Sequence, residues 1–185
     1  TPDADDRLWA AAEMWETTGD ATALADFETR AKQMKVKVDS DFDWSNVKNL
    51  GMFVYVLSSR TGRDATLLAD VQKALKAAAD KLVAQRNSGA YRRDIEGYWW
   101  GVNGSLARTC MVLQIANKIG PNPDYVDTCV DQVSWLLGRN QYNRSQITGL
   151  GINPPMHPHH RPSGGDDIDD PWPGLLVGGG QSATD

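Results

Sequence analysis

The chain has 185 residues, a net charge of −5 and 41% apolar residues, which fits one globular domain or part of one. The acidic balance excludes nucleic acid as a partner, because nucleic-acid-binding proteins neutralise phosphates with a basic patch. A membrane is excluded as well, since no apolar run approaches the ~20 residues of a membrane-spanning helix. Seven tryptophans direct attention to an aromatic-rich cleft.

Apolar residues recur at helical spacing over most of the chain as far as residue 138. The predicted helices cover residues 6–18, 21–34, 44–59, 64–86, 100–119 and 123–138. Those at 44–59 and 100–119 are apolar on most faces, which predicts an inner layer, whereas those at 64–86 and 123–138 keep one polar face for an outer layer. This alternation predicts an all-α fold of repeated helical hairpins.

The connections between these helices carry turn and capping signals. Residues 35–44 and 87–99 break the helical period and are expected to be loops. Elsewhere a Gly is followed closely by Asp or Pro, as at Gly19–Asp20 and Gly62–Asp64, which ends one helix and caps the next.

The two cysteines, Cys110 and Cys129, would suffice for one disulfide. Both lie in apolar helical patterns, however, and a chain of this length does not depend on one bridge for its core. The pattern favours buried free thiols.

From Gly138 onward the chain is rich in Gly and Pro and has no helical period. Such a long irregular stretch is uncommon in a compact chain unless it is functional. We therefore expect the site here.

All three histidines, His157, His159 and His160, lie together beside Arg161 and between prolines. Zinc binding is one interpretation, although no Cys is near and no HExxH motif is present. A structural loop is the second, and a site for a carbohydrate or anionic ligand is the third.

Two segments of this region resemble a known family. Residues 145–161, followed by 173–179, look like the first signature of glycoside hydrolase family 9, the inverting cellulases. Further similar segments are 8–13, 42–44, 98–103 and 136–140. The resemblance implies an (α/α)6 barrel, of which residues 1–185 would be part, with hairpins over 6–138 and a substrate-binding loop region over 139–185.

The resemblance also implies roles for particular residues. His159 and Arg161 fall on the family's His-x-Arg pair beside the scissile bond, so His159 is expected in catalysis and Arg161 in substrate binding. Trp100 falls on a Trp that stacks on a glucose ring, with a core position as the alternative. Trp44 and His160 are further expected substrate contacts, each with a structural alternative.

The activity implied is inverting hydrolysis of β-1,4-glucosidic bonds in cellulose or related β-glucans by a carboxylate base and a carboxylic acid. Neither the family's Asp-x-Gly-Asp motif nor its Asn-Glu-Val-Ala motif is present. We therefore expect the remainder of the catalytic domain as a partner. A non-catalytic carbohydrate-binding module, or an exo-acting enzyme on cello- or chito-oligosaccharides, are the alternatives.

No cofactor is expected to be required. Family members often bind a structural calcium, and Asp5 and Asp6 occupy the matching place, whereas Ser45 stands at another ligand position. The acidic run 164–170 is a second calcium candidate or a solvated loop. An insoluble substrate implies that the protein is secreted.

Overall fold

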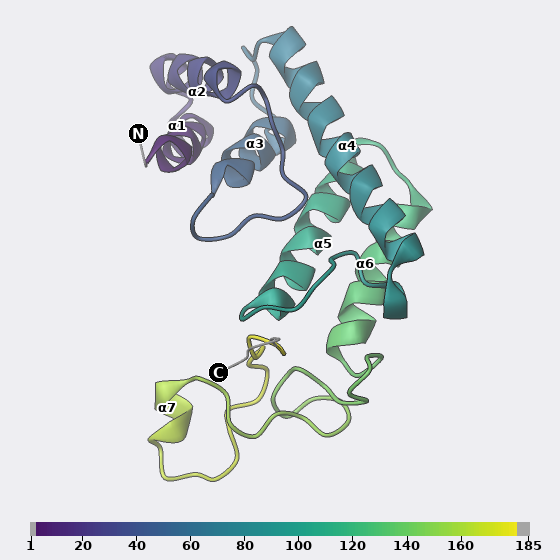
Figure 1. The fold of residues 1–185 in the computed structure, drawn as a ribbon. Helices are drawn as coiled ribbons and strands as arrows, with labels where there is room; N and C mark the ends of the chain where they lie inside the picture. The colour runs from purple at the N-terminus through teal and green to yellow at the C-terminus, as the bar shows by residue number, and fades with distance from the viewer. Residues whose placement is uncertain (1–2, 181–185) are drawn as a thin grey trace.

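The computed structural model describes residues 3–180, in which helices and irregular loops form the whole architecture apart from two isolated β-bridges. Figure 1 shows α1 to α3 at one end, the long α4 beside them, the α5–α6 hairpin next, and an extended loop carrying α7 at the other end. The helices are α1 (Ala4–Thr18), α2 (Ala21–Gln33), α3 (Lys48–Leu57), α4 (Ala65–Ser88), the short 3-10 helix η1 (Ala90–Arg92), α5 (Val102–Ile119), α6 (Pro123–Leu136) and α7 (Arg161–Gly164). The all-α prediction is confirmed.

The capping signals act as the sequence predicts. Gly19 ends α1 in the left-handed conformation at φ 76°, and the Asp20 side chain accepts a hydrogen bond from the Thr22 amide. Asp64 caps α4 in the same way.

Helices α3 and α5 begin later than predicted. Helix α3 begins at Lys48 rather than at residue 44, because the Asp43 carboxylate accepts hydrogen bonds from the Ser45 amide at 2.8 Å and the Ser45 hydroxyl at 2.6 Å. Such an Asx turn offers the backbone an alternative to helix. Helix α5 begins at Val102, after Gly101 at φ 92°. Trp44 and Trp100 therefore lie outside helices.

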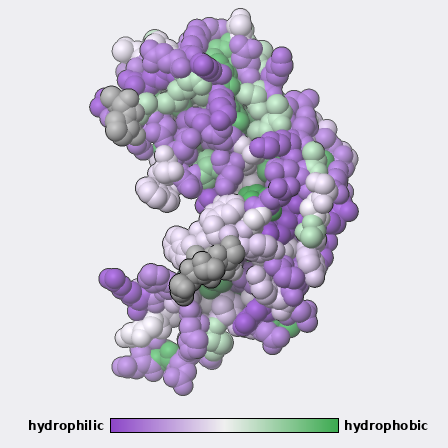
Figure 2. Space-filling model, viewed as in Figure 1, coloured by the Kyte–Doolittle hydropathy of each residue, from purple (hydrophilic) through white to green (hydrophobic). Residues whose placement is uncertain are grey.

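Aromatic rings fill the core between α1, α2 and α3. Tyr55 stacks on Phe27 with ring centroids 4.7 Å apart and contacts Trp15 at 5.8 Å. Leu57, the last residue of α3, is 42% exposed. This helix is therefore less completely buried than its composition predicts. Figure 2 shows the molecule curving around a hollow that opens on one side.

The prediction of free thiols is wrong. Cys110 of α5 and Cys129 of α6 form a disulfide with Cα atoms 4.9 Å apart. The two cysteines lie on opposite sides of the turn at residues 120–122, and the packing of α5 against α6 brings them together across the hairpin. Periodicity within each helix could not reveal this match.

The loop that leads into α5 contains a buried acid. Asp94 is fully buried, and its amide donates to Gln132 Oε1 at 3.1 Å. Thr109 lies beside the carboxylate, and its hydroxyl also donates to Leu106 O at 3.0 Å. Burial raises the pKa of Asp94 to about 7, although Thr109 and Arg93 oppose the rise.

We expect reduction of the disulfide to destabilise the chain by about 3 kcal/mol, because closing a loop of this length restricts the unfolded state. Urea unfolding of the wild type with and without dithiothreitol measures the difference. The Cys110→Ser/Cys129→Ser variant should not respond to the reductant. An equal response of both proteins would contradict the assignment.

We expect the free energy of unfolding to fall as pH rises from about 4 to about 7, because the folded state retains the Asp94 proton that the unfolded state releases near 3.8. Asp94→Asn should remove this loss and be the more stable protein at about pH 8. Asp70→Asn, on the exposed face of α4, is the control. Parallel pH profiles for wild type and Asp94→Asn would refute the assignment.

Candidate functional site

Two adjoining cavities lie at the start of α5, with volumes of about 450 and 460 Å³. We call them together the groove. Both are lined by Trp100, Pro158, His159, Val177 and Gly178. The first cavity adds His160, Leu175 and Leu176, and the second adds Tyr142, Arg144, Ser145, Gln146, Pro155, Met156, His157, Gly179 and Gly180.

One wall of the groove is a segment tied to α5 by backbone and amide hydrogen bonds. The Asn103 amide donates to Gly178 O at 3.1 Å, and its side-chain Nδ2 donates to Val177 O at 3.0 Å. Val177 N in turn donates to Gln146 O at 3.0 Å. Because Asn103 is fully buried, this wall is fixed to the first turn of the helix.

Trp100 presents an open indole to the groove and is 69% exposed. A side chain at Gly178 would meet the indole nitrogen at 3.5 Å, so the glycine backbone packs closely against the ring edge. Gly179, at φ 111°, has a conformation that favours glycine, and a Cβ there would lie 2.9 Å from Asn103 Oδ1. The glycines thus let the wall approach while the ring face stays accessible.

His159 lies where the two cavities meet and is exposed. No hydrogen bond within residues 3–180 holds its imidazole. Both ring nitrogens are therefore available to a ligand, as a donor and an acceptor in the neutral form. The structure brings His159 and Trp100, predicted from distant parts of the sequence, to the same groove.

His160 is engaged in the fold of the loop itself. Its Nδ1 accepts a hydrogen bond from the Ser163 amide at 3.2 Å, and its ring packs edge-on against Trp172 with centroids 5.2 Å apart. Trp172 also donates from Nε1 to Asp166 at 2.5 Å. Although His160 lines the first cavity, these contacts favour the structural role.

Arg161 and Trp44 do not join the groove. Arg161 is exposed at the start of α7 and lines neither cavity. Trp44 is 89% exposed in the loop before α3. That loop is tied to α5 through Asp41 and Arg108, 3.4 Å apart. Substrate contact by Arg161 or Trp44 stays a prediction.

Sequence reasoning missed Tyr142 and Arg144, which line the second cavity. They lie immediately before Ser145, where the resembling segment begins, in a stretch that carries no periodic signal. The buried Asn140 could have indicated them, because an Asn in a Gly- and Pro-rich loop is a common organiser of turns.

An arginine cluster anchors the start of this loop. The Asp131 carboxylate of α6 accepts hydrogen bonds from Arg86 at 2.5 Å, Arg92 at 2.8 Å and Arg139 at 2.5 Å. Burial alone raises the pKa of Asp131, but the three arginines outweigh it and lower the pKa to about 2. The cluster joins α4, η1 and residue 139 to α6.

The residues expected to hold metals do not converge. Within residues 3–180, no three His, Cys, Asp or Glu side chains come together as metal ligands do, the histidine cluster included. Asp5 accepts the Val47 amide at 2.7 Å, and the cavity beside it contains Lys37 and Lys48 but not Asp6. These residues fit a calcium ion poorly, because it requires six to eight oxygen ligands. Calcium binding at Asp5 and Asp6 stays a prediction.

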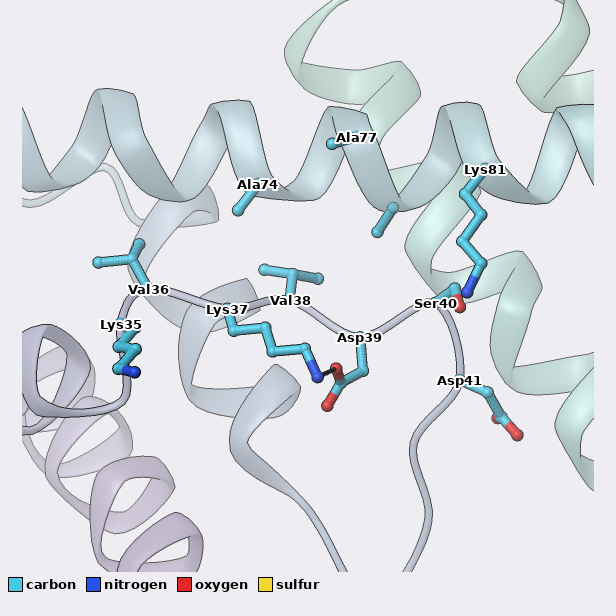
Figure 3. A pocket seen from close by; sticks show the side chains of 11 residues that line it. Lys35, Val36, Lys37, Val38, Asp39, Ser40, Asp41, Ala74, Ala77 and Lys81 are labelled. Carbon is cyan, nitrogen blue, oxygen red and sulfur yellow. Dashed lines mark ion pairs between the residues drawn. The ribbon is translucent and has the colours of Figure 1, made fainter.

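A further cavity, of about 620 Å³, lies between residues 35–41 and α4. Figure 3 shows its alanine floor on α4 and the ion pair between Lys37 and Asp39. The two charged groups are 2.8 Å apart, and Lys48 also pairs with Asp39. No aromatic side chain lines this cavity, so it offers no stacking surface.

Among residues 3–180, no helix combines the length and apolarity needed to cross a bilayer.

Known proteins share both the sequence and the fold. The whole chain, residues 1–185, matches the family described as Glycosyl hydrolase family 9. Endoglucanase D of Acetivibrio thermocellus is 56% identical over 179 residues, covering 96% of this chain and 29% of that protein. A xyloglucan-specific endo-beta-1,4-glucanase of Bacteroides ovatus is 32% identical, covering 95% of this chain and 30% of that protein.

Among solved structures, the GH family 9 endoglucanase J30 has a TM-score of 0.86 at 35% identity, covering 95% of this chain and 32% of that one. AaCel9A, solved in complex with cellobiose-like isofagomine, has a TM-score of 0.85 at 28% identity, covering 97% of this chain and 34% of that one. The chain thus spans about a third of the proteins it matches, and its hairpins form part of an (α/α)6 barrel. On these matches, the chain belongs to glycosyl hydrolase family 9.

Proposed function

We propose that the protein carrying these residues hydrolyses β-1,4-glucosidic bonds of cellulose or a related β-glucan with inversion, and that this chain supplies a sugar-binding wall of its cleft. The observation that carries the proposal is the open indole of Trp100 in a groove shared with His159. The relatives reported above are endoglucanases. They support a β-1,4-glucan as the substrate class.

The groove suits a neutral sugar. The apolar CH face of a pyranose packs on an indole, and the polar edge of the ring system stays free for hydrogen bonds. His159 then donates to, or accepts from, a sugar hydroxyl beside the stacked ring. In this proposal, His159 acts by contacting and orienting substrate at the bond to be cleaved.

The acid and base of the reaction are proposed to come from outside this chain. No Asp or Glu lines either cavity of the groove. Inverting hydrolysis needs two carboxyl groups roughly 6.5–9.5 Å apart on opposite sides of the bond. Residues 1–185 alone should therefore bind glucan without cleaving it, and turnover by this piece would contradict the assignment.

We propose an extracellular location. The disulfide between Cys110 and Cys129 supports it, because disulfides persist in oxidising compartments. A polymeric, insoluble substrate requires the same location.

Release of reducing sugar from β-glucan by the intact protein tests the function. We expect Trp100→Ala to lower kcat/KM about tenfold, mainly through KM, since it removes a stacking surface. His159→Ala should lower kcat as well. Trp9→Phe, remote on α1, should leave both constants unchanged.

Other outcomes would point elsewhere. Binding of glucan without any hydrolysis by the intact protein would favour a non-catalytic carbohydrate-binding module. Faster hydrolysis of chitosan oligomers than of cellotetraose would favour an amino-sugar substrate. If the intact protein neither binds nor hydrolyses any β-glucan, the proposal is wrong.

A further inference from the structure

We propose that Tyr142 forms a second sugar-stacking position in the groove, next to that of Trp100, and takes a further glucose unit of the β-1,4-glucan chain. This inference rests on the proposed function. It adds a binding residue that neither the histidine motif nor the tryptophans indicate.

The loop after α6 holds Tyr142 in place through a buried amide. Asn140, 5% exposed, donates from Nδ2 to Trp135 O at 2.7 Å and to Arg144 O at 2.8 Å. Its Oδ1 accepts the Tyr142 amide at 3.0 Å. Asn143 then adopts φ 49°, which turns the chain back. The backbone that presents Tyr142 is therefore fixed before any ligand arrives.

The side chain itself is left open. Tyr142 is 47% exposed, and its hydroxyl has no hydrogen-bond partner within residues 3–180. The hydroxyl lies beside Gly180, and the exposed aromatic ring presents an apolar face to a sugar.

Three successive glycines, Gly178 to Gly180, form the wall beside which both aromatic residues lie. A Cβ at Gly178 would meet the Trp100 indole nitrogen at 3.5 Å, and a Cβ at Gly180 would meet the Tyr142 hydroxyl at 2.8 Å. Two residues of extended chain span at most about 7 Å. Trp100 and Tyr142 thus contact nearby points of a wall that has no side chains between them, as successive sugar rings require.

A guanidinium borders the same cavity. Arg144 donates from Nε to Asn153 O at 3.2 Å, which fixes the side chain and leaves its terminal nitrogens as donors. Arg144 lines the same cavity as Tyr142. Donors beside an aromatic face suit the hydroxyls of a neutral glucose unit.

Calorimetric titration of the intact protein with thio-linked cello-oligosaccharides of increasing length tests the inference, because these ligands resist hydrolysis. Tyr142→Ala should weaken binding of the longest oligosaccharide about fivefold to tenfold and change cellobiose binding little. Tyr142→Phe should retain the stacking contribution, which also guards against a folding defect in the alanine variant.

Tyr91→Ala is the matched control. Tyr91 is 49% exposed on η1 and lines neither cavity, so its loss should leave every affinity unchanged. If Trp100→Ala weakens binding while Tyr142→Ala behaves like Tyr91→Ala, the second position is wrong and the proposed function stands. If the wild type binds no cello-oligosaccharide, the proposed function fails and the inference fails with it.

Discussion

The groove depends on one buried amide, that of Asn103 in the first turn of α5. Its Nδ2 donates to Gln146 Oε1 at 3.2 Å as well as to Val177 O, and its backbone amide holds Gly178. Three parts of the chain that are distant in sequence therefore meet at one residue. Glycine is required in this wall at Gly179, where φ is 111° and a Cβ would lie 2.9 Å from Asn103 Oδ1.

The helices supply the rigid frame for this arrangement, and the loops supply the chemistry. The disulfide joins α5 to α6, and the arginines around Asp131 join α6 to α4, to η1 and to the start of the 139–145 loop. Arg86 and Asp131 are buried, whereas Arg92 and Arg139 reach Asp131 from the surface. The loop that carries Tyr142 is thus anchored at residue 139 by charge and at Asn140 by hydrogen bonds.

The sequence predicted the features that depend only on neighbouring residues, such as helix caps. Asp20 and Asp64 cap helices because an Asp side chain can reach an amide two or three residues on, and this depends on nearby residues alone. The same reasoning placed the start of α3 too early, since apolar periodicity continues through the Asx turn that Asp43 makes with Ser45.

Contacts between residues far apart in the chain could not be predicted from the sequence. The match between Cys110 and Cys129 depends on the register of two helices, and the place of Tyr142 depends on a glycine run far along the chain. The family resemblance predicted both Trp100 and His159 as site residues, and the structure places both in the groove. It also suggested Arg161, which the short helix α7 holds outside the cavities.

A crystal structure of the intact protein with a bound thio-linked cello-oligosaccharide tests the central claim most directly. The account predicts a glucose ring stacked on the indole of Trp100, with a hydroxyl within hydrogen-bond distance of His159 and the sugar chain lying along the glycine wall. Sugar rings bound elsewhere, with the indole of Trp100 covered by other residues of the protein, would contradict it.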